Sequence, residues 1–255
     1  MSPRFSIIIP SFNQGIFIAQ TINSILNQSY QDFEILVIDG GSTDSTLDIL
    51  KSYNDRIFWL SEPDRGQTHA INKGIAITKG DVITYLNSDD YYLEGTFEKV
   101  AGIFNQNDDV LWITGDYLIV DEGGNKIQSA IAKYKTFFRK RLSFNLLTVL
   151  NPIIQPGTFL RRELISKTGL FNEELRYTMD YEYWLRAFKI QKPYVLSDEL
   201  AAFRIHKKSK GGSSFRQQFD EELEVAKKHQ SNYLLIFFHT LHNYLIMASY
   251  YFLKK

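Results

Sequence analysis

The sequence predicts an α/β protein with a Rossmann-like, doubly wound and mostly parallel sheet that carries helices on both faces. Short apolar, β-branched runs such as FSIII (5–9) and FEILVI (33–38) alternate with segments of helical periodicity. Near-continuous apolar strands of this kind are typical of parallel sheets that are covered on both sides. Hydrophobic residues make up 44% and charged residues 23% of the 255 residues, which are values of a globular protein.

The first half of the chain contains four predicted strands separated by predicted helices. In chain order they are a strand at 5–9, a helix with apolar positions 18, 22, 25 and 26, a strand at 33–38, a helix at 46–53, a strand at 57–60, a helix at 70–77 and a strand at 81–86. A further helix is expected where apolar side chains share one face, namely Leu93, Phe97, Val100, Ala101 and Phe104. In such a layout, ligands bind at the carboxyl ends of the strands.

The second half is less regular. Residues 111–132 are predicted to form two strands joined by a Gly-Gly hairpin. A strand and a short helix that ends at Gly169 follow within 151–169, and residues 178–188 have the pattern of a helix start. The runs PYVL and ELAAFRI are predicted as late strands.

Composition and charge exclude several classes of protein. Lys plus Arg and Asp plus Glu both number 29, and the net charge of +0 removes the usual electrostatic case for nucleic acid as a partner. The absence of cysteine excludes disulfides, zinc-thiolate sites and thiol nucleophiles. The opening residues MSPRFSIIIP lack the pattern of a signal peptide, so a cytoplasmic location is expected.

The chain shows no internal repeat and no linker, so we expect one domain over residues 1–213 and a helical segment at 214–255. Within that segment, residues 232–253 carry no charge and approach the ~20 residues of a membrane span. A polar stripe interrupts its centre and is formed by His239, His242 and Asn243. An interfacial or partner-binding helix and a helix packed on the domain are therefore both open, and a true span is less favoured.

Polar clusters follow the four strands of the first half. They are PSFNQG (10–15), DGGSTD (39–44), EPDRGQ (62–67) and NSDD (87–90). Because parallel strands end at the same edge of a sheet, we expect these clusters to share one rim. Three of the clusters also have a simple alternative as helix caps, for which the candidates are Asn13 or Ser11, Ser42 or Thr43, and Asp89 or Asp90.

Three acidic positions carry the predicted chemistry. Asp39, at the end of a buried strand, is placed to accept a hydrogen bond from a nucleotide base or a ribose. A carboxylate of NSDD is a hard oxygen ligand that suits Mg²⁺ or Mn²⁺ beside a diphosphate. Far downstream, Asp180 is either a helix cap or a general base. The rings around it fit a sugar-binding wall and belong to Tyr177, Tyr181, Tyr183 and Trp184.

Together, the order and spacing of these motifs resemble the family 2 glycosyltransferases, which have the GT-A fold. The resemblance covers residues 5 to about 206. The matching stretches are SIIIPSFN (6–13), VIDGGSTDST (37–46), EPDRGQTHAINKG (62–74), GDVITYLNSDD (80–90), QPGTFLRRELISKTGLFNEEL (155–175) and DYEYWLR (180–186).

The resemblance implies an inverting enzyme that moves a sugar from a nucleotide-diphosphate donor, with a UDP-sugar favoured, to a hydroxyl of a glycan or lipid-linked acceptor. It also implies a divalent metal, Mn²⁺ or Mg²⁺, and a role in cell-surface polysaccharide synthesis. Residues 1–110 would form the nucleotide-sugar half and residues 111–213 the acceptor half. A lipid-linked acceptor would suit a peripheral position at the inner face of the membrane, with contact through residues 232–253.

Roles carry over by position. Asp180 matches the base that deprotonates the acceptor, Asp89 matches the metal ligand of the family's Asp-x-Asp motif, and His206 matches a further metal ligand of some relatives. The residues that would line the donor site are Pro10, Ser11, Phe12, Asn13, Asp39, Arg65, Gly66, Asn87 and Ser88. The loop KKSKGGSS (207–214) would close over the diphosphate.

Two positions depart from the family pattern. Asn87 stands where an acidic residue is expected, and Met179 replaces the glutamate that precedes the base. Asn87 favours an alternative, a nucleotide-sugar or glycan binding module without turnover. A sugar-phosphate nucleotidyltransferase would need a basic, glycine-rich loop after the first strand, and PSFNQG has no basic residue.

Overall fold

The first four long strands form a parallel sheet, as the sequence predicts. The computed structural model describes residues 3–206 and 215–253. Strands β1 (Phe5–Ser11), β2 (Phe33–Asp39), β3 (Phe58–Ser61) and β4 (Val82–Tyr85) lie in the order β3-β2-β1-β4, and each neighbouring pair is parallel. Their carboxyl ends therefore meet at one rim of the sheet, which carries the four polar clusters.

The second half of the chain extends this sheet with antiparallel and parallel pairs. Strands β7 (Thr158–Arg161), β6 (Trp112–Val120), β8 (Tyr194–Arg204) and the short β5 (Tyr91–Tyr92) follow β4 in that order. The pairs β4–β7, β7–β6 and β8–β5 are antiparallel, whereas β6–β8 is parallel. The result is one mixed sheet of eight strands flanked by helices, and its parallel part is confined mainly to the first half.

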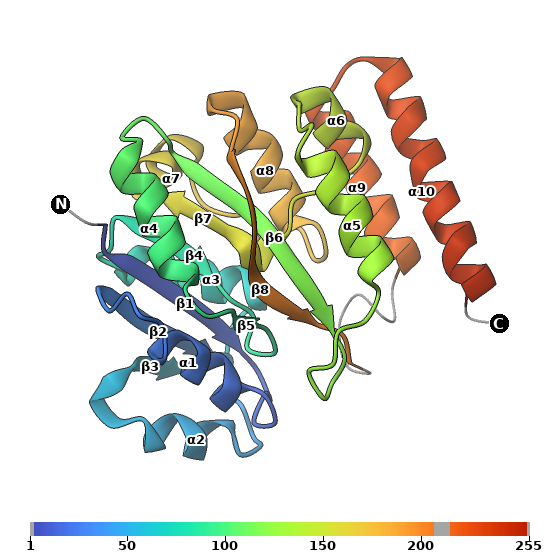
Figure 1. Ribbon diagram of the computed structural model, residues 1–255. Helices are drawn as coiled ribbons and strands as arrows, with labels where there is room; N and C mark the ends of the chain where they lie inside the picture. Colours follow the sequence, from blue (N-terminus) through green and yellow to red (C-terminus); the bar gives the residue numbers. More distant parts are fainter. Residues whose placement is uncertain (1–2, 207–214, 254–255) are drawn as a thin grey trace.

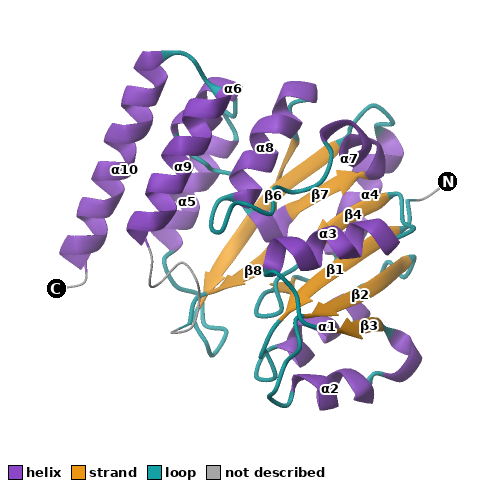
Figure 2. Ribbon diagram, turned by 180° about the vertical axis from the view of Figure 1, so that it is seen from behind, coloured by secondary structure: helices purple, strands orange, loops and turns teal. Residues whose placement is uncertain are grey.

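Helices cover both faces of the sheet (Figures 1 and 2). On β1, side chains alternate between faces, so Phe5, Ile7 and Ile9 pack in one core and Ile8 packs in the other. The first core includes α1 (Ile18–Leu26), α2 (Thr46–Ser52) and α4 (Thr96–Gln106). The second includes α3 (Gln67–Ile77), α7 (Arg162–Thr168) and α8 (Met179–Ile190). The remaining helices are α5 (Ser129–Arg139), α6 (Phe144–Val149), α9 (Phe215–His229), α10 (Tyr233–Leu253) and the short η1 (Asn54–Arg56) and η2 (Gln155–Gly157).

The prediction of two strands within 111–132 is wrong. β6 is the single strand there, Lys126 forms only an isolated bridge with Val120, and α5 begins at Ser129. The physical reason is that both edges of β6 are already occupied, one by β7 and the other by β8. The two predicted late strands are likewise one strand, β8, whose pairing with β6 shifts register near Asp116.

The C-terminal helices pack against the α/β domain. Val225 and Ala226 of α9 are buried in the same core as α8, and α10 lies against α6 and α9 at the outer edge of the molecule (Figure 1). The polar stripe of α10 points inward, because buried His239 donates to the Thr148 carbonyl at 2.7 Å and Asn243 bonds His239 at 3.0 Å. The prediction of a helix packed on the domain is confirmed for this face.

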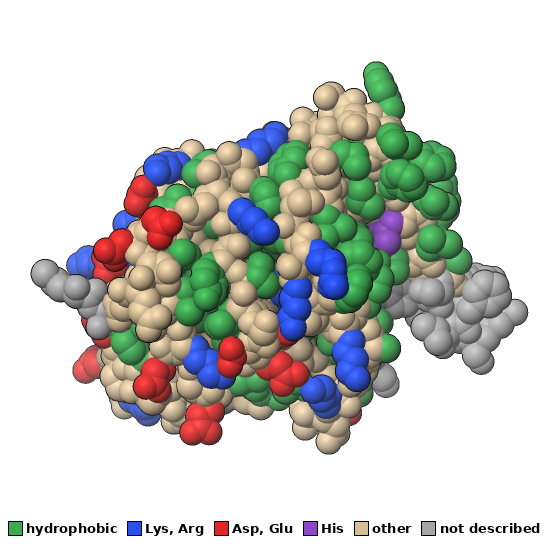
Figure 3. All heavy atoms as spheres, turned by 45° about the horizontal axis from the view of Figure 1, so that its top comes forward, with side chains coloured by type: hydrophobic (Ala, Val, Ile, Leu, Met, Phe, Trp, Pro, Cys, Tyr) green, Lys and Arg blue, Asp and Glu red, His purple; other side chains and the backbone are tan. Residues whose placement is uncertain are grey.

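The opposite face of α10 is apolar and exposed. Its exposed side chains are Tyr233, Leu234, Phe237, Phe238, Leu241, Tyr244 and Leu245. Figure 3 shows hydrophobic side chains gathered at this end of the molecule, with Lys and Arg side chains beside them. Across the residues that the structure describes, no helix has the length and apolarity to cross a membrane. A typical surface helix turns its apolar side chains to the core, whereas α10 turns His239 and Asn243 inward and its apolar side chains to solvent.

Candidate active site

The NSDD cluster forms a tight turn directly after β4. The amide of Asp90 donates to the Asn87 carbonyl at 3.0 Å, and Ser88 is buried within the turn. Neither Asp89 nor Asp90 caps the next helix, because α4 begins after Gly95, which adopts the left-handed conformation. The helix-cap interpretation of this cluster is therefore wrong.

The two adjacent carboxylates have different environments. Asp90 is buried and accepts hydrogen bonds from the Arg204 amide at 2.8 Å and from Asn87 Nδ2 at 3.1 Å. Burial raises the pKa of Asp90 well above its usual range, and the neighbouring Asp89 raises it further, against the lowering effect of those two hydrogen bonds. Asp89 stays partly exposed and faces Nε2 of His206 at 2.9 Å. The two predicted metal ligands, 117 residues apart in the chain, thus meet at the rim.

Arg204 holds this arrangement together, and the sequence reasoning missed it. Its guanidinium donates to the carbonyls of Asp89 at 2.8 Å and Glu122 at 2.7 Å and to Gln20 Oε1 at 2.6 Å. The ring of His206 packs on Phe17 with 4.8 Å between the ring centroids, and the Arg204 guanidinium lies over the rings of Phe17 and Tyr91. A charged residue inside the apolar run ELAAFRI was the signal available in the sequence.

Asn87 has a structural explanation. Its Oδ1 accepts from Gln67 Nε2 at 2.6 Å, and its Nδ2 donates to buried Asp90. An aspartate at this position would have no donor for Asp90 and would add a negative charge beside it. The Asn87 amide therefore stabilises the turn that presents Asp89. Gln67, which bonds Asn87, is the first residue of α3, so this helix also contacts the turn.

The loops after β1 and β2 are tied to each other. Asp39 is fully buried and accepts from the amides of Gly41 and Ser42 and from the hydroxyl of Ser61. The Asn13 amide donates to Ser42 Oγ at 2.7 Å, and Asn13 Oδ1 accepts from the Thr43 amide at 2.8 Å. Asp39 therefore shapes the loop from inside, and its predicted contact with a base or ribose stays a prediction.

The predicted helix caps in these loops are wrong. Helix α1 begins after Phe17 and helix α2 begins after Ser45, and neither residue makes a side-chain cap bond in the described structure. Asn13 instead supports the chain just before α2 from the neighbouring loop.

The end of β1 presents two side chains suited to a ligand. Phe12 is 60% exposed, which fits a surface for a flat base. Ser11 is buried beside Pro10, yet its hydroxyl has no hydrogen-bond partner among the described residues. A buried hydroxyl without a partner costs free energy unless a ligand or water satisfies it.

Arg65 and Gly66 lie at the start of α3, on the same side of the sheet as Asp180. Arg65 forms an ion pair with Glu173 at 2.6 Å, and Gly66 precedes the helix with φ of 111°, a conformation that favours glycine. The next residues of α3 touch both predicted catalytic regions, because Gln67 bonds Asn87 and the hydroxyl of Thr68 contacts Met179 Sδ at 2.6 Å.

Asp180 is in the first turn of α8. The helix begins after Thr178, so the interpretation of Asp180 as its N-cap is wrong. Its half-buried carboxylate accepts from the Tyr181 amide at 2.7 Å. Burial raises the pKa of Asp180, and the negative charge of Glu221 adds to this, whereas Lys135 and the backbone hydrogen bond lower it. A raised pKa makes a carboxylate a better proton acceptor, as a general base requires.

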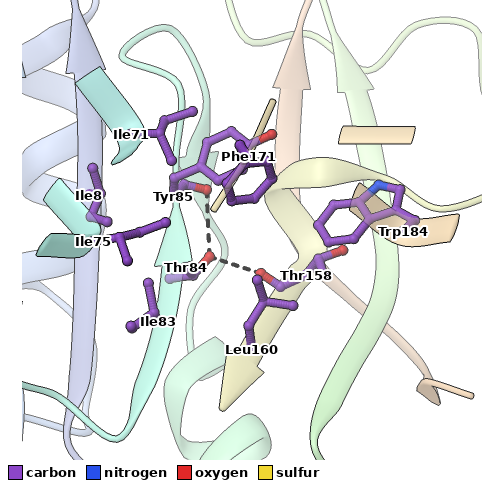
Figure 4. A pocket seen from close by; sticks show the side chains of 10 residues that line it. All are labelled: Ile8, Ile71, Ile75, Ile83, Thr84, Tyr85, Thr158, Leu160, Phe171 and Trp184. Atoms are coloured by element: carbon purple, nitrogen blue, oxygen red, sulfur yellow. Dashed lines mark hydrogen bonds between the residues drawn. The ribbon is translucent and has the colours of Figure 1, made fainter. Parts of the chain in front are cut away.

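The aromatic residues after Asp180 belong to the core. Tyr181, Tyr183 and Trp184 are each at most 1% exposed, so the sugar-binding wall is wrong for these three. Figure 4 shows a small void nearby, in which Trp184 and Phe171 face Ile8, Ile71 and Thr84. Its lining is mostly apolar and includes none of the residues predicted for donor or metal. This void is therefore not the donor site.

The side chains present fit a divalent cation in part. Asp89 and His206 supply an oxygen and a nitrogen 2.9 Å apart, and Mn²⁺ accepts both kinds of ligand. In the described part of the chain, no group of three or more acidic or histidine side chains is placed to hold a metal ion. Further ligands would therefore come from a diphosphate and from water. The predicted closing loop at 207–214 lies outside the described residues.

Comparison with known proteins identifies the family of this chain. The model of the glycosyl transferase family 2 matches residues 6–169, so the chain belongs to that family of glycosyltransferases. An uncharacterized glycosyltransferase of Rickettsia prowazekii is 33% identical over 208 residues, which cover 80% of this chain and 65% of the relative. The chain thus spans about two thirds of that relative's length.

Two solved structures share the fold. TarS of S. aureus, residues 1–349 in complex with UDP-GlcNAc, has a TM-score of 0.70 and 20% identity over 88% of this chain and 66% of that one. The mannosyltransferase PcManGT of Pyrobaculum calidifontis, in complex with GDP-Man and Mn²⁺, has a TM-score of 0.70 and 16% identity over 96% of this chain and 70% of that one. Both likenesses establish the GT-A architecture of the sheet and its helices.

Proposed function

We propose that this protein is an inverting glycosyltransferase that moves a sugar from a nucleotide-diphosphate donor to a hydroxyl. The meeting of Asp89 and His206 at the rim, 2.9 Å apart, carries the proposal. Asp180 supports it, because adjacent residues of α3 contact both regions: Gln67 bonds Asn87, and Thr68 contacts Met179, the residue before Asp180. The rim therefore has one region for a diphosphate and one for a base.

In the proposed reaction, an acceptor hydroxyl oxygen attacks the anomeric carbon of the sugar. The bond from that carbon to the diphosphate oxygen breaks with its electron pair, so the nucleoside diphosphate leaves. Asp180 takes the hydroxyl proton, and attack from the opposite face inverts the anomeric configuration. A divalent metal held by Asp89 and His206 would supply positive charge to the leaving diphosphate.

The proposal extends to the chemical class of the donor and the acceptor. The nucleotide site would be lined by Pro10, Ser11, Phe12 and Asn13, and Asp39 would bind the base or the ribose. We favour a UDP-sugar with Mn²⁺ or Mg²⁺, and a glycan or lipid-linked acceptor used in cell-surface polysaccharide synthesis. UDP-GlcNAc in the TarS complex and GDP-Man with Mn²⁺ in the PcManGT complex support a nucleotide sugar in general.

A direct assay tests this function. We expect the full chain to release nucleoside diphosphate from at least one of UDP-glucose, UDP-GlcNAc and GDP-mannose with MnCl₂. Asp180→Asn should lower that rate by about 10² to 10⁴-fold, the usual contribution of a general base, with donor affinity nearly unchanged. Asp108→Asn, an exposed carboxylate on another part of the surface, is the control. Wild-type turnover in Asp180→Asn would remove Asp180 from the mechanism.

A binding module without turnover is the alternative, and Asn87 is the observation that favours it. The amide removes one of the two charges expected in the metal motif. The same panel separates the two functions. Binding of a nucleotide sugar by calorimetry, with no release of nucleoside diphosphate at any metal concentration, would support the module and contradict the enzyme.

We also propose that the exposed apolar face of α10 contacts the inner face of the membrane. Phe237 and Tyr244 on this face are 58% and 64% exposed, and Phe137 on the neighbouring α5 is 51% exposed. Exposed Lys140 and Arg141 follow α5 directly, which suits anionic headgroups.

We expect the protein to float with vesicles of equal phosphatidylglycerol and phosphatidylcholine. The double variant Phe237→Ser, Tyr244→Ser should stay at the bottom of the gradient, and equal flotation of both proteins would contradict the contact.

A further inference from the structure

The chain that leads into Asp180 is held from two sides. Between α7 and α8, Glu173 accepts from Arg65 at 2.6 Å and from Asn72 Nδ2 at 3.1 Å, which fixes the loop to α3. Asn72 also bonds both backbone groups of Phe171, at 2.9 and 3.0 Å. These contacts anchor the start of the loop and leave its last three residues, 176–178, to other partners.

Those last three residues are bound by one side chain from α9. Oε1 of Glu221 accepts from the Arg176 amide at 2.8 Å. Oε2 accepts from the amides of Tyr177 at 2.7 Å and Thr178 at 3.0 Å, and from the Thr178 hydroxyl at 3.1 Å. A single carboxylate therefore receives three consecutive backbone N–H groups just before α8. Tyr177 adds a second link to α9 through Gln217 at 3.0 Å.

This arrangement fixes the chain that enters α8, and it does so from a distant element. The first N–H groups of a helix have no partner within the helix, and a side chain of the N-cap residue usually satisfies one of them. Thr178, the N-cap of α8, makes no such bond in the described structure. Hydrogen bonds to an ionised acceptor are shorter and stronger than neutral ones, so Glu221 holds residues 176–178 firmly just before the first turn of α8.

We propose that Glu221 is a positioning residue for Asp180. Resting on the proposed function of Asp180 as the base, this inference assigns α9 to the active site, although the sequence predicts α9 only as part of a C-terminal helical segment. Glu221 fixes residues 176–178, and thereby the direction in which the first turn of α8 presents the Asp180 carboxylate. It supplies from another helix a carboxylate near the base, where Met179 occupies the expected glutamate position.

The electrostatic surroundings of Asp180 agree with this role. Asp180 interacts electrostatically with Lys135 of α5, Glu221 and Glu222 of α9, and Tyr85 of β4. Buried Glu222 has a pKa raised to about 7 by burial, with Asp180 raising it and Lys135 lowering it. The base therefore lies near ionisable groups of two other helices, Lys135 of α5 and Glu221 and Glu222 of α9.

Kinetic measurements on two variants test the proposal. Glu221→Met removes every acceptor, and Glu221→Gln keeps one acceptor oxygen. We expect kcat to fall about tenfold to 100-fold in the first and less in the second, because a misplaced base slows the chemical step. The donor KM should stay within about twofold of wild type, since the donor loops are elsewhere. The reaction is nucleoside diphosphate release from the nucleotide sugar that the panel above selects, with MnCl₂.

Two readouts separate positioning from general stability. Loss of the Glu221 charge lowers the pKa of Asp180, so the acidic limb of the kcat profile should move to lower pH. Amide hydrogen exchange at residues 176–178 should become faster in both variants without any donor present. Glu224→Gln, at an exposed position of α9 where Glu224 pairs with Lys227, is the matched control and should change neither readout.

The outcomes distinguish this proposal from the function on which it rests. If Asp180→Asn is inactive while both Glu221 variants keep wild-type kcat, pH profile and amide exchange, positioning by Glu221 is overturned and the proposed function stands. If Asp180→Asn keeps its turnover, the proposed function fails whatever Glu221 does. If Glu221→Met does not fold, Glu221→Gln decides, and a wild-type kcat per folded molecule with an unmoved acidic limb would overturn the proposal.

Discussion

The loops of the donor side are held in a different way from Asp89, the predicted metal ligand, and Asp180, the predicted base. Asp39 bonds Gly41 and Ser42, its neighbours in the chain, and Asn13 bonds the same loop about 30 residues away. Asp89 depends instead on Arg204 and His206, more than 100 residues later, and the helix that carries Asp180 depends on α9. The donor loops can therefore form with β1 and β2, whereas the chemistry requires the last third of the chain to be in place.

The largest effect should come from Asp89, the predicted metal ligand that depends on distant partners. Asp89→Asn removes the negative ligand that faces His206, and a metal ion contributes several kcal/mol to a reaction of this kind. We expect the rate of nucleoside diphosphate release to fall at least ~10²-fold and Mn²⁺ binding, followed by calorimetry, to be lost. Asp108→Asn should retain both. If Asp89→Asn binds Mn²⁺ like the wild type, the metal site lies elsewhere.

Arg204 tests whether the long-range partners matter as much as the ligand itself. Arg204→Lys removes the planar guanidinium that bonds Asp89, Glu122 and Gln20 together, and a lysine cannot replace its fork of donors. We expect Mn²⁺ affinity to fall about 10 to 100-fold, as for other residues that orient metal ligands.

Arg161→Lys is the matched control for this variant. Arg161 also bonds backbone carbonyls and lies over an aromatic ring, Phe104, but it is at the other end of the sheet. Both variants should lower the Tm, and only Arg204→Lys should weaken Mn²⁺ binding. Equal Mn²⁺ affinity in the two proteins would show that the Asp89 turn is rigid without Arg204.

The same contrast explains how far the sequence predicts the structure. Periodicity identified β1 to β4 with their helices, because apolar runs and turn residues are local signals. The prediction of a second strand within 111–132 was wrong because β7 and β8 already pair with the two edges of β6. Those strands come later in the chain, so the local sequence pattern does not reveal their pairing. Tyr181, Tyr183 and Trp184 were read as a sugar wall for the same reason, since burial depends on packing.

For the site, the resemblance located Asp89, His206 and Asp180, and the structure brings the first two together. It did not locate Arg204 or Glu221, whose importance arises from the backbone groups they bind. A side chain that binds backbone groups can do so whatever residue type it supports, so this role leaves no pattern in the sequence. The sequence marks Asn87 only as a departure from the acidic metal motif, and the structure gives it a role as the donor to Asp90.

The pH dependence of turnover gives a smaller but specific test of the catalytic side. A general base must be deprotonated, and burial raises the pKa of Asp180. As the pH is lowered, kcat should therefore begin to fall at a higher pH than it would with an ordinary aspartate as the base. Lys135 lowers that pKa, and Lys135→Met should therefore move the acidic limb to still higher pH while the alkaline plateau changes little. Lys133→Met, exposed on the same helix, should leave the profile unchanged. A shift to lower pH would contradict the assignment of Asp180.

The smallest expected effect lies on the donor side, where one buried hydroxyl lacks a partner among the described residues. Ser11→Ala removes a group that makes no bond within the described chain, so the Tm should be unchanged or slightly higher. If the donor satisfies this hydroxyl, the variant loses one hydrogen bond of about 0.5–1.5 kcal/mol, and the donor KM should rise about twofold to tenfold. Ser24→Ala is the opposite case, because Ser24 Oγ bonds the Thr21 carbonyl and the Tyr92 amide, and it should lower the Tm with no change in KM. An unchanged donor KM in Ser11→Ala would show that the Ser11 hydroxyl does not bind the donor. The donor loops would then bind the ligand through other groups.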